Sequence, residues 1–184
     1  MVVMESKVAL KAGDAAPGFD LLGIDDKRYS LSSFKDYDAT LVVFMCNHCP
    51  YVKAKVPAIS EIHEKFKGRV AVVGINSNDA IAYPDDSFDS MKEFARERKI
   101  GFFYLVDETQ EIAKKYGAVC TPDPFLFDAS GKLVYHGRID SGASIDTATG
   151  GDVMEASFKK VLDGEKITED FLPSQGCSIK WKGA

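Results

Sequence analysis

The sequence contains no apolar run that approaches the roughly 18 residues of a membrane-spanning helix, so we expect no membrane segment. Its 184 residues include only four cysteines, which are too few for a small disulfide-stapled scaffold. Positive charge is not in excess either, because 23 Lys and Arg stand against 28 Asp and Glu, for a net charge of -5. That balance argues against a nucleic-acid partner.

The N-terminus also lacks a basic segment followed by a long apolar stretch, so we expect no signal peptide. The expected location is therefore the reducing cytoplasm, where a permanent structural disulfide is rare. A chain that is 45% hydrophobic and 28% charged has the composition of an ordinary globular protein. We expect one domain over residues 1–184, with a core at about 8–163 and a C-terminal tail at 164–184.

Apolar patterns predict an α/β protein with a central mixed sheet flanked by helices. Buried-strand patterns cover 39–45, 69–76 and 102–106, and helical patterns cover 50–67, 87–99, 107–117 and 152–164. Two hairpins are predicted at 19–34 and 124–138, the first of them an N-terminal extension. Asp107 with Gln110, and Asp152 with Glu155, match the capping-box pattern that marks a helix start.

The stretch "MCNHCPY" places Cys46 and Cys49 where the first buried strand ends and a helix begins. Unpaired N–H groups and the helix dipole stabilise a thiolate there, and the thiolate is the reactive form of cysteine. His48, when protonated, adds a cation beside Cys46. We expect Cys46 to attack a substrate disulfide and Cys49, more buried and with a higher pKa, to resolve the mixed disulfide. The electrons then reside in the dithiol, so no bound cofactor is expected.

Two other interpretations of the pair remain open. Both cysteines could be small buried hydrophobic residues without chemistry. They could also hold a metal, but a structural zinc site needs four ligands, and Cys120 and Cys177 are isolated in the sequence. No metal site is therefore expected, although a module that binds a soft metal or senses oxidation stays an alternative of a different class.

Three stretches together resemble a known family: "GDAAPGFDLLGIDDKRYSLSSFKD", "TLVVFMCNHCPYVKAKVPAISEIHEKFKGRVAVVGIN" and "CTPDPFLFDASGKLVYHGRID". They are similar to the thioredoxin superfamily, and more closely to its AhpC/TSA (alkyl hydroperoxide reductase/thiol-specific antioxidant) branch of peroxiredoxin-like proteins, here with a CxxC pair. The resemblance implies a thioredoxin-like fold and a helix kinked at Pro57. It also implies a cis peptide bond before Pro122, with the backbone of Thr121 binding a substrate peptide strand.

The peroxiredoxin pattern is incomplete. The Cys-Pro pair makes Cys49 the more natural match to a peroxidatic cysteine, yet Cys46 stands where the family has a Thr or Ser. If Cys46 held the peroxidatic role, Val43 would occupy that position. Neither alignment supplies the hydroxyl that orients peroxide. Arg138 is the candidate for the arginine of a peroxidatic site, with a solvated strand-end charge as the plainer interpretation.

The sequence also departs from the thioredoxin pattern, because Thr40 stands where thioredoxin has a buried acidic residue. Asp123 could replace that proton acceptor, or be a solvated turn residue. Cys120 could approach the pair from its place before Pro122, or pack at a strand end. Cys177 in the tail could be a third, resolving thiol, or filler beneath the tail.

The sequence thus predicts a thiol–disulfide oxidoreductase that acts on protein or low-molecular-weight thiols and disulfides, as a monomer or homodimer. The alternative in the same fold is a thiol-dependent peroxidase, in which Cys49 or Cys46 reacts with peroxide and the other cysteine closes the disulfide.

Overall fold

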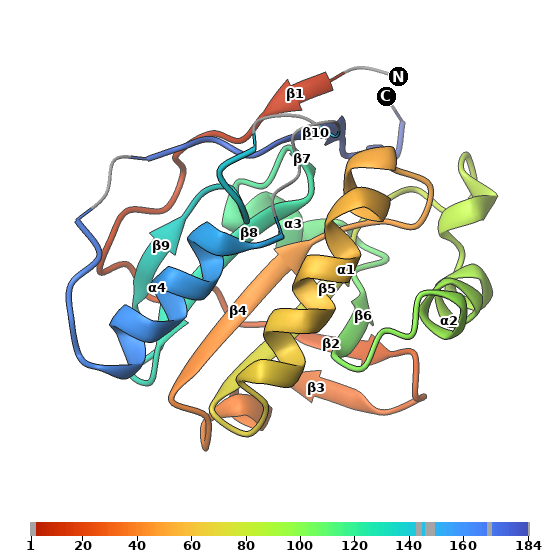
Figure 1. The fold of residues 1–184 in the computed structure, drawn as a ribbon. Coiled ribbons are helices and arrows are strands. Elements are labelled where there is room, and N and C mark those ends of the chain that lie inside the picture. Colours follow the sequence, from red (N-terminus) through yellow and green to blue (C-terminus); the bar gives the residue numbers. More distant parts are fainter. Residues whose placement is uncertain (1–2, 143–144, 146–149, 169–170, 184) are drawn as a thin grey trace.

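The computed structural model describes residues 3–142, 145, 150–168 and 171–183, and its centre is a seven-stranded sheet (Figure 1). The strands are β2 (Asp20–Gly23), β3 (Arg28–Ser30), β4 (Ala39–Phe44), β5 (Val70–Asn76), β6 (Phe103–Val106), β8 (Asp123–Asp128) and β9 (Leu133–His136). Their order across the sheet is β3-β2-β6-β5-β4-β8-β9. The β4, β5 and β6 strands are parallel, and both hairpins pair antiparallel, so the sheet is mixed as predicted.

Strand β4 lies inside the sheet and is buried on both faces, as its continuous apolar run predicts. Leu41 and Val43 belong to one hydrophobic cluster, and Val42 and Phe44 belong to the other. This alternation follows from the two-residue period of a strand. Packing on both faces therefore fixes the end of β4, and with it the position of the residues that follow.

Helices cover both faces of the sheet. They are α1 (Pro50–Lys65), α2 (Phe88–Glu97), α3 (Glu111–Tyr116) and α4 (Asp152–Leu162). Helices α1, α2 and α4 contribute Val56, Met91 and Phe158 to the cluster that holds Val43, whereas α3 packs Tyr116 on the opposite face (Figure 1). In the described part of the chain, no helix is both long and apolar enough to cross a lipid bilayer.

A second, three-stranded sheet was not predicted. It consists of β1 (Val3–Glu5), β10 (Gln175–Ser178) and β7 (Cys120–Thr121), with β10 in the middle and both pairings antiparallel. Figure 1 shows β1 and β10 side by side near the two chain ends, above the start of α1. The tail sequence "QGCS" has neither alternation nor a β-branched run, so local pattern could not reveal this strand.

Both predicted capping boxes are wrong in the same way, because each helix begins after a residue in the left-handed region. Helix α3 follows Gln110 at φ 63, and the buried Asp107 instead accepts hydrogen bonds from Ala113 N and Ser77 Oγ. Helix α4 follows Gly151 at φ 81, and Asp152 accepts from Ser141 N. The Asp107 carboxylate thus binds the third residue of α3 from outside the N-cap position, whereas Asp152 binds the segment that precedes α4.

Candidate active site

Cys46 and Cys49 lie in the turn that joins β4 to α1, as predicted. Cys49 is the N-cap residue of α1, and Pro50 takes the first helical position, where its missing N–H leaves no partner unsatisfied. Helix α1 runs 16 residues, and Pro57 lies inside it. Both cysteines are closed off from solvent, with Cys46 1% and Cys49 0% exposed. The positive end of the helix dipole therefore acts on a buried pair of thiols.

The peptide bond between Thr121 and Pro122 is cis, which confirms the expectation from the family resemblance. Thr121 contacts both sulfurs of the pair. Its hydroxyl lies 3.3 Å from Cys46 Sγ, and the Cys49 thiol donates to its carbonyl oxygen at 3.3 Å. Residue 121 thus joins the two cysteines to the second sheet.

The edge of the chain at Thr121 is already paired with a strand of the protein itself. In the β7–β10 pairing, Cys177 stands opposite Thr121 and Ser178 stands opposite Cys120. This is the edge where the resemblance implies a substrate peptide strand. In this structure the tail strand β10 occupies it instead.

That pairing brings a third thiol into the site. The Sγ atoms of Cys49 and Cys177 are 2.7 Å apart, and Cys177 is buried. The sequence separation of 128 residues is bridged entirely by tertiary structure. Of the two sequence interpretations of Cys177, the structure therefore places it against the pair, at Cys49.

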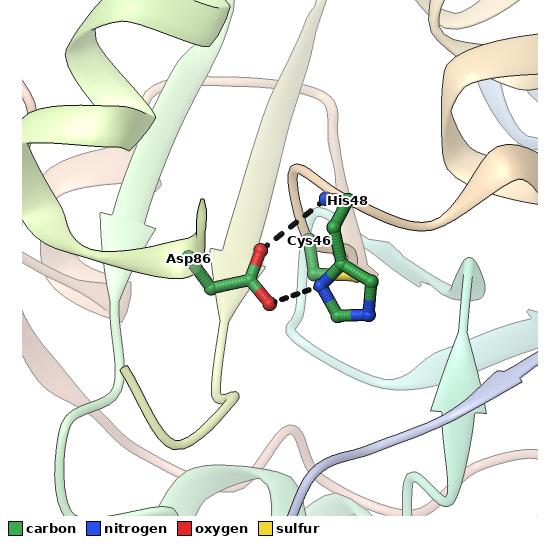
Figure 2. Close-up of side chains that lie close together, drawn as sticks. All are labelled: Cys46, His48 and Asp86. Atoms are coloured by element: carbon green, nitrogen blue, oxygen red, sulfur yellow. Dashed lines mark hydrogen bonds and ion pairs between the residues drawn. The ribbon is translucent and has the colours of Figure 1, made fainter. Parts of the chain in front are cut away.

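The His48 side chain contacts Asp86, which lies at the end of the short 3-10 helix η2 (Pro84–Asp86). Figure 2 shows both oxygens of the Asp86 carboxylate facing His48. His48 Nδ1 lies 2.6 Å from Asp86 Oδ2, and the backbone N of Asn47 donates to Oδ1 at 2.7 Å. Asn78 Nδ2 donates to Oδ2 at 2.7 Å. A buried carboxylate is tolerated only when it is satisfied in this manner.

The hydrogen bonding favours the thiolate at Cys49, which reverses the expected order of the two pKa values. The pKa of Cys49 is lowered to about 5, first by the hydrogen bond from Cys46. Burial opposes this shift, and hydrogen bonds from Cys177 and from the backbone N–H of Val52 support it. The pKa of Cys46 is raised by its hydrogen bond to Cys49, by burial and by the charge of Asp86. Cys49 has the lower pKa because its sulfur receives these hydrogen bonds, whereas Cys46 faces the Asp86 carboxylate.

The contact between His48 and Asp86 favours the charged form of both partners. The hydrogen bond to Asp86 raises the pKa of His48, and a thiolate at Cys49 raises it further. Burial alone would raise the pKa of Asp86, but hydrogen bonds from His48 and Asn78 keep it below its ordinary value. The raised pKa favours the cationic form of His48 beside its carboxylate partner, and its role toward the cysteines stays a prediction.

Three further candidates lie beside the site rather than in it. Asp123 is fully buried and accepts from His136 Nε2 at 2.8 Å, so the interpretation as a solvated turn residue is wrong. Its described partner is His136, not a cysteine. Cys120 is buried, and burial raises its pKa, which disfavours a reactive thiolate. Arg138 lines a small cavity with Pro122 and Lys55, and no described contact joins it to either cysteine.

Sequence reasoning did not single out Asp86 or Asn78. The acidic loop that contains Asp86 carries several carboxylates of which only this one is buried against the cysteines, and spacing cannot tell them apart. Asp86 also completes a group of three possible metal ligands, because one ligand atom each of Cys46, His48 and Asp86 lie within 4.8 Å of one another. A thiolate, an imidazole and a carboxylate form a donor set that zinc accepts.

Curated relatives of the chain are thiol-based redox proteins. Peroxiredoxin Q, chloroplastic, from Populus jackii is 33% identical over 144 residues, which span 73% of this chain and 64% of that protein. Thiol-disulfide oxidoreductase ResA from Bacillus thuringiensis subsp. konkukian is 25% identical over 126 residues, or 68% of each chain.

Solved structures share the fold over nearly the whole length. An uncharacterized conserved protein from Geobacillus kaustophilus is 40% identical, with a TM-score of 0.94 and coverage of 100% of this chain and 98% of that one. The thioredoxin domain of a thiol-disulfide oxidoreductase from Bacteroides vulgatus matches at a TM-score of 0.66 and 20% identity, covering 83% and 98% of the two chains. The fold is thioredoxin-like. A family model described as the AhpC/TSA family matches residues 12–136, more than half of the sequence, and the chain therefore belongs to the AhpC/TSA family.

Proposed function

We propose that this protein is a thiol–disulfide oxidoreductase in which Cys46 and Cys49 cycle between a dithiol and a disulfide. The observation that carries the proposal is the hydrogen-bonded pair of thiols at the start of α1, against the cis bond before Pro122. The relationship to ResA, a thiol-disulfide oxidoreductase, supports it. The expected partners are protein or low-molecular-weight thiols and disulfides.

The electrostatics of the site favour Cys49 as the first nucleophile, in place of the Cys46 expected from sequence. The Cys49 thiolate attacks one sulfur of a substrate disulfide, and one substrate thiolate leaves and takes up a proton. Cys46 then loses its proton and attacks the Cys49 sulfur of the mixed disulfide. The second substrate thiol leaves, the Cys46–Cys49 disulfide forms, and the substrate has gained two electrons. Reversing these steps oxidises a dithiol substrate.

His48 assists the first step of this reaction, the attack by Cys49, and Thr121 assists the second, the attack by Cys46. The His48 cation stabilises the Cys49 thiolate before attack. The thiolate raises the pKa of His48, and by the same attraction the cation favours the thiolate. The Thr121 hydroxyl, 3.3 Å from Cys46 Sγ, can donate to the resolving thiolate as it forms, since this hydrogen bond lowers the pKa of Cys46. Asp86 works against a second negative charge at Cys46, so only one thiolate is favoured at a time.

The test of these roles is the reaction of Cys46→Ser and Cys49→Ser with a fluorescent mixed disulfide of glutathione. Cys46→Ser, made in a Cys177→Ser background so that no neighbouring thiol can resolve the adduct, should form a long-lived mixed disulfide at Cys49, whereas Cys49→Ser should react at least tenfold more slowly. Cys120→Ser is the matched control, since Cys120 is equally buried but does not contact the pair. Fast reaction of Cys49→Ser at Cys46 would restore the order expected from sequence, and unreactive wild-type protein would contradict the function.

A second candidate function is a thiol peroxidase, favoured by the low pKa of Cys49 and by the proline that follows it. The Cys49 thiolate would break the O–O bond to give a sulfenic acid, and the departing oxygen would take a proton. Cys46 would then displace water from Cys49 and form the same disulfide. Stopped-flow measurement of thiol loss with hydrogen peroxide separates the two functions, because peroxide-driven loss as fast as disulfide-driven loss would favour the peroxidase.

The alternative of another class, a metal-binding module, has one supporting observation in the cluster of Cys46, His48 and Asp86. Both oxygens of Asp86 already accept hydrogen bonds, so a metal would have to replace the bond from His48. Metal analysis of anaerobically purified protein tests it. One equivalent of bound metal that is lost in His48→Gln would overturn the oxidoreductase assignment.

A further inference from the structure

We propose that Cys177 is a third redox residue of the site, which attacks Cys49 in the Cys46–Cys49 disulfide and displaces Cys46. The disulfide then moves from Cys46–Cys49 to Cys49–Cys177 within one chain. This inference rests on the proposed function, because the exchange starts from the Cys46–Cys49 disulfide.

The positions of the three sulfurs carry the proposal. Cys49 is hydrogen-bonded to Cys46 on one side and lies 2.7 Å, Sγ to Sγ, from Cys177 on the other. All three side chains are at most 1% exposed. Cys49 is therefore the central sulfur of a buried row, and either neighbour can reach it without a large movement of the backbone.

The tail is built to hold Cys177 at this point. A Cβ atom at Gly176 would lie 1.9 Å from the carbonyl oxygen of Thr121, so only glycine allows β10 to approach the cis bond this closely. On the far side of Cys177, the backbone of Lys180 donates to Asn78 Oδ1 at 2.9 Å and accepts from Gln110 Nε2 at 2.7 Å. Ile179 is buried in the core beside α3. Contacts on both sides of Cys177 thus fix its thiol against Cys49.

The exchange balances without an external oxidant. Cys177 loses its proton and attacks the Cys49 sulfur, so that the Cys49–Cys177 bond forms while the Cys46–Cys49 bond breaks. The electron pair of the broken bond leaves on Cys46, which takes up the proton that Cys177 lost. Cys177 is oxidised, Cys46 is reduced, and the chain still holds one disulfide.

The charge of Cys49 controls when Cys177 can act. Burial, the hydrogen bond to Cys49 and the Cys49 charge together raise the pKa of Cys177 to about 12. In the Cys46–Cys49 disulfide that charge is gone, and two of the causes that keep Cys177 protonated disappear. Cys177 is thus more readily deprotonated in the oxidised site than in the reduced one, although burial acts on it in both.

The exchange has a structural consequence for the site. A Cys49–Cys177 bond joins the start of α1 to β10 and locks the tail over the edge at Thr121. It also returns Cys46 to the thiol form next to the Thr121 hydroxyl. The oxidised protein would therefore keep its peptide-binding edge covered by its own chain.

The experiment uses the full chain, reduced anaerobically and then treated with one equivalent of the thiol oxidant diamide. After alkylation, non-reducing digestion and mass spectrometry, wild-type protein should show both Cys46–Cys49 and Cys49–Cys177 peptide pairs. Cys46→Ser, which keeps three of the four cysteines, should lose two thiols and show Cys49–Cys177 alone. Cys46→Ser with Cys177→Ser should form no intramolecular disulfide.

A positional variant adds a second test. Gly176→Val should abolish the Cys49–Cys177 pair while Cys46–Cys49 persists, because β10 can no longer lie against Thr121. Gly18→Ala is its control, since a Cβ atom there meets nothing within 4 Å. Circular dichroism melting confirms that each variant is folded.

The outcomes separate this inference from the proposed function. Wild-type protein that forms Cys46–Cys49, together with a folded Cys46→Ser that never links Cys49 to Cys177, would overturn the role of Cys177 alone. Wild-type protein that never forms Cys46–Cys49 would overturn the proposed function and the exchange with it.

Discussion

At the scale of single residues, the reactivity of the site follows from which sulfur receives more hydrogen bonds. Burial disfavours a thiolate at either cysteine. Cys49 overcomes this because two thiols and two backbone N–H groups point at its sulfur, whereas Cys46 faces the Asp86 carboxylate.

The first prediction concerns the titration of Cys49. Ultraviolet absorbance of the thiolate should show a midpoint near pH 5 in the reduced wild type, against about 8.5 for free cysteine. Cys46→Ala should raise the midpoint because it removes the strongest donor, and Cys120→Ser should leave it unchanged. A wild-type midpoint near the ordinary value, or one that survives Cys49→Ser, would contradict this account.

The second prediction concerns stability and pH at His48. The pKa of His48 is raised from 6.5, so the ion pair's contribution is complete below that pH and is lost as pH rises through the raised value. The pKa of Asp86 is lowered from 3.8, so the contribution fades again only as pH falls through the lowered value. Between these limits, His48→Gln should cost about 1–3 kcal/mol of unfolding free energy.

Urea denaturation at about pH 5.5 and about pH 9 checks the His48 prediction. The loss caused by His48→Gln should be smaller at the higher pH, because the protonated fraction of wild-type His48 falls as the pH rises through its raised pKa. An equal loss at both values would mean that packing of the ring, such as its stacking on Tyr83, matters more than its charge.

Sequence could identify the site only in part at this scale. The spacing of Cys46 and Cys49 and their place after a buried strand sufficed to locate the pair, and the family resemblance located Pro122. Asp86 and Asn78 could not be found, since their roles depend on a loop that folds back over the end of β4. The pKa order was missed because it depends on donors from Val52 and Cys177, which meet Cys49 only in three dimensions.

At the scale of elements, the loop between β5 and α2 and the tail strand β10 act as one support for the site. Asn78 joins them, since its amide donates to Asp86 and its carbonyl oxygen accepts from the backbone of Lys180. The loop places the carboxylate, and the tail places Cys177. Neither element has a pattern of its own that predicts this partnership.

The third prediction is that Asn78→Ala loosens both elements together. The variant should lose about 1–3 kcal/mol of stability, because it leaves buried partners unsatisfied. Hydrogen exchange at residues 177–180 should speed up relative to the wild type. Gln175→Ala, which removes an exposed bond from β10 to Glu5, is the control and should change stability by less than about 0.5 kcal/mol. Unchanged exchange in Asn78→Ala would show that the tail is held elsewhere.

Elements with strong patterns were predicted and those without were missed. The runs at β4 and β5 are apolar throughout and could only be buried strands, and the α1 pattern extends over more than four turns. The predicted capping boxes were wrong because Gln110 and Gly151, both in the left-handed region, occupy the N-cap positions in place of Asp107 and Asp152. The β10 strand was missed because its four residues become a strand by pairing with β1 and β7, which their own composition does not indicate.

At the scale of the whole molecule, one buried ion pair ties the helix that carries the site to the segment after β9. Lys55 of α1 lies 2.6 Å from Asp140, and the two side chains are 9% and 0% exposed. Such a pair adds little over a well-packed apolar alternative, but breaking it leaves a buried charge. The pair thus ties the orientation of α1 to the segment that follows β9.

The fourth prediction is that Lys55→Met lowers the unfolding free energy by about 3–5 kcal/mol, since Asp140 is left without its cation. The double variant with Asp140→Leu should recover most of that loss. Chemical denaturation measures both. A loss below about 1 kcal/mol in the single variant would show that Asp140 keeps adequate partners without Lys55.

The measurement that tests the central claim most directly is a redox titration of the wild-type protein in glutathione buffers, followed by acid quenching, alkylation and peptide mapping. The account predicts that oxidation removes two thiols per chain, reversibly and in one two-electron step, with a Cys46–Cys49 peptide pair among the products. Thiols that stay reduced across the whole titration, or a disulfide that never includes Cys46 with Cys49, would contradict it.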